Sequence, residues 1–197
     1  MTYHQPWIRA HNREPIPDML RSLLLLAAFS ISPSTESDAA VDGTTAVGAV
    51  AFDQIKLRMR ERWPQVARID VAELAGRIDG GDAPLIFDVR EEAEFAVSHI
   101  RGARWAAKID EALALLEGVP REREIVVYCS IGYRSAELAQ RLGDAGFTKV
   151  RNLDGSIFEW ANSGHAVFRE GVRVHEVHPY NWIWGTLLDE EFHAEKR

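Results

Sequence analysis

Residues 125–135 have the sequence IVVYCSIGYRS, residues 136–142 continue it as AELAQRL, and the architecture we expect follows from this stretch. The short β-branched run at its start predicts a buried strand, and apolar residues at helical spacing after Arg134 predict a helix. Cys129, the only cysteine of the chain, falls between strand and helix. Free backbone N–H groups of such a loop and the positive end of the helix dipole favour an anion there.

A thiolate is such an anion, so we expect the pKa of Cys129 to lie below that of a free cysteine. That shift would make the side chain nucleophilic at neutral pH. The alternative is a buried cysteine that behaves as a small inert hydrophobe. The glycine and arginine that follow in the loop favour the nucleophile.

Around this stretch, predicted strands and helices alternate. Asp70 has the form of an N-cap that opens a helix through Ile78, and Gly146 lies where the helix from Ser135 would need a left-handed cap. Further helices are predicted over 91–97 and 111–116, and strands over 85–89, 103–106, 125–128 and 150–153. This order predicts an α/β fold with a mostly parallel central sheet and helices on both faces. Ligands of such sheets bind beyond the carboxyl ends of the strands, where Cys129 falls.

Four segments carry a family resemblance. Cys129-Ser130-Ile131-Gly132-Tyr133-Arg134 resembles the active-site loop of single-domain rhodaneses, the sulfurtransferases that carry a persulfide on cysteine. Residues 85–90 with Glu94-Phe95, residues 98–103 and residues 145–160 resemble further segments of that family in the same order. The resemblance covers residues 68–168 and departs from the pattern at Arg101, where a proline is usual, and at Ser156, where a second glycine is common.

The resemblance implies the three-layer rhodanese-like fold and sulfur transfer. Cys129 would take a sulfane sulfur from a small anionic donor such as thiosulfate and pass it, as a persulfide, to a thiol or protein-cysteine acceptor. No cofactor or metal would be required. The donor and the persulfide would be bound by the loop residues Ser130, Ile131, Gly132, Tyr133, Arg134 and Ser135, with Arg134 drawing in the anionic donor through its fixed charge.

Four further residues are predicted to have structural roles near the site. Asp88 and Arg90 close a predicted strand, and we interpret them as an ion-paired or loop-bracing couple with Glu94, because persulfide transfer needs no strong general base. His99 is placed with them in this supporting set.

Two other functions use the same residues. One is a binding or regulatory module that keeps the fold without turnover, and persulfide formation would separate it from an enzyme. The other is a cysteine-dependent phosphatase or arsenate reductase. Phosphatases of this kind close the loop with an arginine one position later than Arg134 does here. The shorter loop suits a single terminal sulfur better than a tetrahedral oxyanion.

Composition sets milder limits. With 197 residues and 46% hydrophobic content, the chain is long enough for one core with extensions. We expect a rhodanese-like domain over 67–170 and an aromatic-rich tail over 171–197 that folds back onto the domain; partner binding by the tail is the alternative. The net charge of −7 disfavours nucleic acid as a partner. A single cysteine excludes a thiolate zinc cluster, and we interpret His175 and His178 as surface residues.

The N-terminal extension, residues 1–45, contains an apolar stretch over 20–31 that resembles a secretory signal peptide. Export, to the periplasm or elsewhere outside the cytoplasm, is one expectation, with a translation start at Met1 or at Met19. A cytoplasmic protein with an apolar N-terminal helix is the other. The stretch is too short to span a bilayer. Residues 33–45 are typical of a flexible linker.

Residues 46–66 predict an amphipathic helix, with an apolar face formed by Phe52, Ile55, Met59 and Trp63. We favour packing of this face against the domain. Binding of the helix's basic residues to anionic lipid is the alternative.

Overall fold

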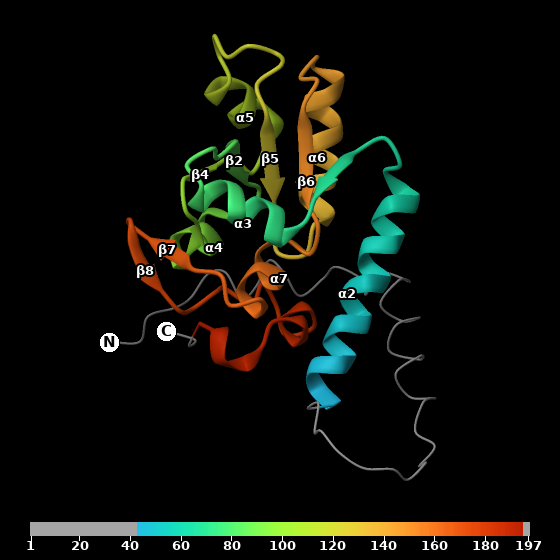
Figure 1. Ribbon diagram of the computed structural model, residues 1–197, viewed down its shortest axis with the longest axis vertical. Coiled ribbons are helices and arrows are strands. Elements are labelled where there is room, and N and C mark those ends of the chain that lie inside the picture. Colours follow the sequence, from blue (N-terminus) through green and yellow to red (C-terminus); the bar gives the residue numbers. More distant parts are fainter. Residues whose placement is uncertain (1–42, 195–197) are drawn as a thin grey trace, which may run out of the picture. The chain divides into compact units, whose positions relative to one another are not determined.

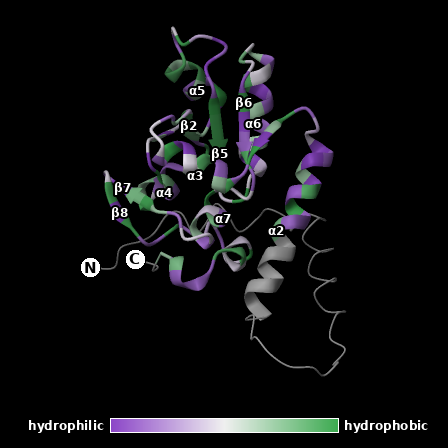
Figure 2. Cartoon of the chain, viewed as in Figure 1, coloured by the Kyte–Doolittle hydropathy of each residue, from purple (hydrophilic) through white to green (hydrophobic). Residues whose placement is uncertain are grey.

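Strand β5 (Ile125–Tyr128) lies in the middle of a five-stranded sheet in the computed structural model, which describes residues 43–194. All four of its side chains are fully buried, and Figure 2 shows the strand as hydrophobic along its length. The strand pairs in parallel with β2 (Leu85–Asp88) on one side and β6 (Val150–Leu153) on the other. A strand buried on both faces is what the unbroken β-branched run predicts.

The sheet has the order β1-β6-β5-β2-β4, with β1 (Ala67–Ile69) and β4 (Ala103–Trp105) at its edges, and every pairing is parallel. Helices α3 (Val71–Asp79) and α4 (Glu92–Val97) connect strands in one direction across the sheet. Helices α5 (Ile109–Leu115) and α6 (Tyr133–Asp144) connect strands in the other. Because parallel crossovers are right-handed, the two pairs of helices cover opposite faces.

Contacts between the helices agree with this arrangement. Helix α5 packs against α6, and α7 (Ser156–Asn162) packs against α3. The expected α/β architecture, a mostly parallel sheet with helices on both faces, is therefore confirmed. In Figure 1 the arrow of β5 points toward α7. The N–H of Ile157 in α7 donates to the carbonyl of Cys129, the residue that follows β5.

Local signals explain several element ends. The carboxylate of Asp70 accepts a hydrogen bond from the Glu73 N–H at 2.7 Å and caps α3, as the sequence predicts. Helix α6 begins at Tyr133, two residues before the predicted start, because Gly132 turns the chain with a positive φ of 108° directly into the helix. Arg134 and Ser135 thus belong to the first turn of α6 rather than to the loop.

A second sheet of three antiparallel strands was not predicted. It consists of β3 (His99–Ile100), β7 (Val167–Arg169) and β8 (Val172–Val174). The predicted domain end at 170 falls in the turn between β7 and β8, so the C-terminal tail begins only after Val174. The tail contains two short 3-10 helices, η2 (Trp184–Leu187) and η3 (Glu190–Phe192).

Helix α2 (Gly43–Arg62) precedes the sheet, and the four apolar residues that the sequence singles out are buried: Phe52, Ile55, Met59 and Trp63. Lys56 forms an ion pair with Glu159 of α7 at 2.5 Å, and Arg60 forms one with Asp154 at 3.1 Å. These contacts favour packing on the domain over lipid binding, because the apolar face is already covered.

The apolar stretch over 20–31 and residues 33–42 of the predicted linker lie outside the described residues. Residues 43–45, which the sequence predicts as linker, instead form the first turn of α2. Among the residues that the structure describes, no helix combines the length and the apolar character needed to cross a bilayer.

Candidate active site

Cys129 follows directly after β5, at the carboxyl edge of the sheet. Its thiol is almost fully buried, with 1% of the residue exposed. The Gly132 N–H donates a hydrogen bond to Sγ at 3.1 Å. The sulfur therefore lies inside the turn that the loop makes before α6, facing backbone donors.

The surroundings lower the pKa of Cys129. Burial acts in the opposite direction, because it disfavours the charged form, but the Arg134 guanidinium and the backbone N–H groups of Ser135 and Gly132 together outweigh it. The result is a thiol that ionises more readily than a free cysteine, as the sequence predicts. A buried inert cysteine would have its pKa raised instead.

Gly132 is required by the shape of the loop. Its φ of 108° is strained for any residue with a side chain, and a Cβ there would lie 2.9 Å from Cε of Met59 in α2. Its carbonyl accepts a hydrogen bond from Nδ2 of the buried Asn152 at 3.0 Å. Helix α2 and strand β6 thus fix the loop from two sides.

A buried carboxylate organises the polar side chains of the loop. Glu94 of α4 accepts hydrogen bonds from both Nη atoms of Arg134, at 3.0 and 3.1 Å, and from the Ser130 hydroxyl at 3.0 Å. Burial tends to raise the pKa of Glu94, but the charge and hydrogen bonds of Arg134 hold it below its usual range. The pair therefore stays ionised and ties the start of α6 to α4.

Asp88 and Arg90 form a separate pair beneath the loop. Both are fully buried, and Nη2 of Arg90 lies 2.6 Å from Oδ2 of Asp88. The Tyr128 hydroxyl donates to the same carboxylate at 2.7 Å and accepts from the Ile100 N–H at 3.1 Å. Burial, and next the charge of Asp88, raise the pKa of Tyr128 well above its ordinary value. Glu94 is not a hydrogen-bond partner of this pair, because its carboxylate binds Arg134.

Ser156 contacts the nucleophile residue itself. Its hydroxyl accepts a hydrogen bond from the Cys129 N–H at 3.2 Å and donates to the Leu153 carbonyl at 3.2 Å. The residue adopts a φ of 53°, which favours glycine. The sequence marks Ser156 only as a departure from a glycine, and no spacing rule relates it to Cys129.

Two backbone bonds join the same regions. The N–H groups of Ile157 and Phe158 donate to the carbonyls of Cys129 and Ser130 at 3.2 and 3.1 Å. The first turn of α7 therefore holds the first two loop residues in place.

The remaining predicted site residues lie as follows. Ile131 is buried, Tyr133 is 38% exposed, and the Ser135 hydroxyl is buried and helps to lower the pKa of Cys129. His99 lies in β3 and stacks on Phe95 at 4.1 Å between ring centroids. The structure thus brings Glu94 to the cysteine loop, whereas His99 contacts Phe95.

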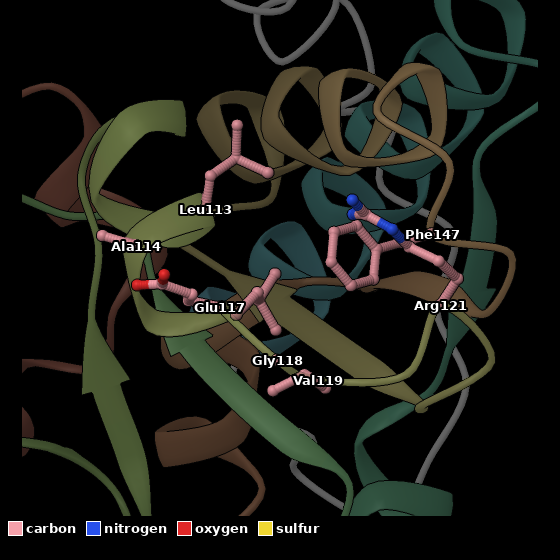
Figure 3. A pocket seen from close by; sticks show the side chains of 8 residues that line it. Leu113, Ala114, Glu117, Gly118, Val119, Arg121 and Phe147 are labelled. Carbon is pink, nitrogen blue, oxygen red and sulfur yellow. The ribbon is translucent and has the colours of Figure 1, made fainter.

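A surface pocket at the other end of the sheet is lined by residues around the end of α5, with the Arg121 guanidinium 4.3 Å from the centre of the Phe147 ring (Figure 3). Arg121 precedes the start of β5, whereas Cys129 follows its end, so this pocket is separate from the thiolate.

Between residues 43 and 194 there is no group of three or more His, Cys, Asp or Glu side chains suited to hold a metal.

Comparisons with known proteins agree with this geometry. The family model for the rhodanese-like domain matches residues 70–163. The chain is 32% identical to a sulfurtransferase of Allochromatium vinosum over 99 residues, which cover 50% of this chain and 92% of that protein. It is 38% identical to the probable adenylyltransferase/sulfurtransferase MoeZ of Mycobacterium tuberculosis over 93 residues, 45% of this chain and only 23% of that protein.

Among solved structures, thiosulfate sulfurtransferase from Pseudomonas aeruginosa superimposes with a TM-score of 0.51. The identity is 21%, and the match covers 64% of this chain and 23% of that one. This similarity concerns the fold.

Proposed function

The chain belongs to the rhodanese-like domain family, and we propose from this membership that it transfers sulfane sulfur through a persulfide on Cys129. The observation that carries the proposal is the buried thiol whose sulfur accepts a backbone N–H bond and whose pKa is lowered despite burial. A relative that matches over 92% of its own length is itself named a sulfurtransferase, which supports the same chemistry here.

The reaction has two displacement steps. In the first, the Cys129 thiolate attacks the outer sulfur of a thiosulfate-like donor, an S–S bond forms to Cys129, and the donor's own S–S bond breaks as sulfite leaves with the electron pair. In the second, a nucleophilic acceptor such as cyanide or a thiolate attacks the outer sulfur of the persulfide and releases the Cys129 thiolate. Neither step needs a redox partner or a metal.

The backbone supplies the charge stabilisation. The N–H groups of Gly132 and Ser135 are directed at the sulfur and would bind the negative charge wherever it lies on the persulfide. The buried hydroxyl of Ser135, which also helps to lower the pKa of Cys129, is a further donor for the outer sulfur. These groups stabilise both a thiolate and a persulfide anion, which is what a shuttle between two half-reactions requires.

Arg134 has a divided role. Both Nη atoms are bound by Glu94, so the charge that the donor meets is partly neutralised. The guanidinium still lies close enough to Cys129 to lower its pKa, and the thiolate in turn raises the pKa of Arg134, against the effect of burial. We propose that Arg134 braces the loop through Glu94 and favours the anionic form of the sulfur, with donor capture as a secondary effect.

Phosphate-ester hydrolysis is the reaction that this proposal excludes. The loop closes on Arg134, one position earlier than in cysteine-dependent phosphatases, and this shorter loop suits a single terminal sulfur better than a tetrahedral oxyanion. A generic aryl phosphate should therefore be hydrolysed at the background rate. Phosphatase activity that disappears in Cys129→Ser would contradict the proposal.

Our proposals for the partners and for the cellular compartment rest on the sequence alone. We propose a small anionic donor, a thiol or protein-cysteine acceptor and no nucleic acid partner, given the net charge of −7. Export by the 20–31 stretch stays a prediction, which the mass of the mature chain would test through loss of the N-terminal residues.

The experiment is intact-mass analysis of the purified chain after incubation with thiosulfate. Sulfur transfer adds about 32 Da to Cys129, and cyanide removes it. A binding module without turnover shows no added mass. Cys129→Ser, treated in the same way, is the control for non-covalent adducts.

A further inference from the structure

The cysteine loop reaches solvent through only two of its side chains. The other loop residues from Cys129 to Ser135 are buried, whereas Tyr133 is 38% exposed and the side chain of Arg134 is 30% exposed. A reagent that approaches the thiolate across the loop therefore passes beside Tyr133 or Arg134. What lies against these two side chains decides what reaches the sulfur.

The Tyr133 side is flanked by the end of α2. The Tyr133 ring packs edge-on against Trp63 with 4.7 Å between ring centroids, and the Arg62 guanidinium lies 5.7 Å from the Tyr133 ring. Trp63 is buried, so this side is fixed by the core of the domain.

The Arg134 side is covered by Tyr180 of the C-terminal tail. The Tyr180 ring centre lies 4.8 Å from Cζ of Arg134, so the aromatic ring occupies one face of the guanidinium. Glu94 and Ser130 already bind the Nη atoms. Both the Nη edge and one face of the Arg134 guanidinium are therefore occupied. Tyr180 adopts a φ of 62°, a strained conformation for this residue type, and the surrounding tail must hold it there.

Residues 178–187 lie between two anchors, and we name them the tail arch. At one end Val177 is fully buried, and its N–H donates to the Phe192 carbonyl at 2.6 Å. At the other end Asn162 of α7 donates to the Leu187 carbonyl at 2.9 Å and accepts from the Asp189 N–H at 3.0 Å. Figure 1 shows the tail in red beside α7.

We propose that Tyr180 is a specificity-determining residue for the sulfur transfer proposed above, on which this inference rests. With the tail arch in place, small anions such as thiosulfate and cyanide pass the Tyr180–Arg134 contact and reach Cys129. A bulky thiol or a protein cysteine reaches the sulfur only when the arch is displaced from Arg134. Displacement has to break the Tyr180–Arg134 contact and the packing of Tyr180, Trp184 and Leu187 against the core, so we expect it only when a partner binds the arch.

The test measures access to the thiol directly. Cys129 is the only cysteine, so mass analysis counts alkylation at that residue alone. The rate with iodoacetamide, a small reagent, is compared with the rate with a maleimide attached to a polyethylene glycol chain. The ratio of the two rates removes any change in the thiolate fraction.

In Tyr180→Ala we expect the rate with the bulky reagent to rise about two- to thirtyfold, the range set by loss of a cation–π contact, and the iodoacetamide rate to rise less. Tyr180→Phe keeps the ring, so its rate with the bulky reagent should stay nearer to that of the wild type than to that of Tyr180→Ala. Trp182→Ala is the matched control, because Trp182 lies in the same arch and is 78% exposed. Asn162→Ala releases an anchor without touching Tyr180, and it should shift the ratio in the same direction.

An unchanged ratio in both Tyr180→Ala and Asn162→Ala overturns the inference. So does an equal rise in Trp182→Ala. Alkylation requires only the thiol and not turnover, so the proposed function is judged separately by the mass gain with thiosulfate. Sulfur loading with an unchanged ratio removes the role of Tyr180 alone. A shifted ratio without sulfur loading removes the proposed function and, with it, the role of Tyr180 in sulfur transfer, and leaves Tyr180 only as a residue that controls access to the thiol.

Discussion

Replacing Glu94 with glutamine tests the polar support of the cysteine loop. Glu94 is 2% exposed and binds Arg134 at 3.0 and 3.1 Å as well as the Ser130 hydroxyl. Glutamine has nearly the same shape but no charge, and its amide N–H₂ faces donors that need an acceptor. The positive charge of Arg134 then loses its carboxylate partner.

The expected loss of stability follows from the burial of both partners. Removing one member of a buried ion pair costs about 3–5 kcal/mol, and we reduce this to about 2–4 kcal/mol because the side chain of Arg134 is 30% exposed. For a domain of this size the melting temperature should fall by about 4–16 °C. At the same time the pKa of Cys129 should decrease, because the positive charge beside the thiolate is no longer neutralised by Glu94.

The contribution of Glu94 to stability depends on pH in a defined direction. The native-state pKa of Glu94 is lowered, so its contribution to stability is fully present above the ordinary carboxyl pKa of 4.5 and is lost as pH falls through the lowered value. The difference in unfolding free energy between wild type and Glu94→Gln should therefore be constant near neutral pH and shrink below about pH 4.5.

Urea unfolding at several pH values and titration of thiolate absorbance measure the two effects. Glu92→Gln is the matched control, because Glu92 lies on the same helix and is exposed. An unchanged unfolding free energy together with an unchanged Cys129 pKa would refute the reasoning, since it would mean that the pair contributes neither to stability nor to the thiolate.

Three further substitutions extend the test. Gly132→Ala should destabilise the domain by about 1–2 kcal/mol in urea unfolding, because alanine is strained at a φ of 108°, whereas Cε of Met59 is the flexible end of its side chain and can move. Wild-type stability would show that the loop relaxes freely. Ser156→Ala should lower the free energy of unfolding by about 1–3 kcal/mol, because it leaves the Cys129 N–H unpaired. Ser156→Gly should lower it less, because glycine also relieves the strain of the positive φ, and equal losses in the two variants would show that this strain is negligible. Arg134→Ala should raise the pKa of Cys129 and the thiosulfate KM, with Arg134→Lys recovering part of the change, and an unaltered thiolate titration in Arg134→Ala would exclude its electrostatic role.

The strands and helices near Cys129 could be predicted because their signals are local. The β-branched run of β5 and the Asp70 cap are properties of a few neighbouring residues, and both were predicted correctly. Strands β3, β7 and β8 are two or three residues long and exist through pairing between distant segments, so no window of sequence shows them.

The candidate active site, like the fold, has one part that the local sequence predicts and one part that it does not. The nucleophile and its loop follow from one contiguous segment, whereas the partner of Arg134 is 40 positions away in sequence and that of the Cys129 N–H is 27. From the sequence, Glu94 is predicted to brace the loop together with Asp88 and Arg90, which lie close to it in the chain. In the folded structure the helix start at Glu91 directs the Glu94 carboxylate to Arg134 instead, while Asp88 and Arg90 bind each other.

The central claim is that Cys129 carries sulfur. Intact-mass analysis of the full chain after thiosulfate, in the absence of reducing agent, tests it most directly. We predict a gain of about 32 Da that cyanide removes and that is absent in Cys129→Ser. A chain whose mass stays unchanged, although Cys129 is alkylated readily by iodoacetamide, would contradict the claim, because a reactive thiolate would then be present without sulfur transfer.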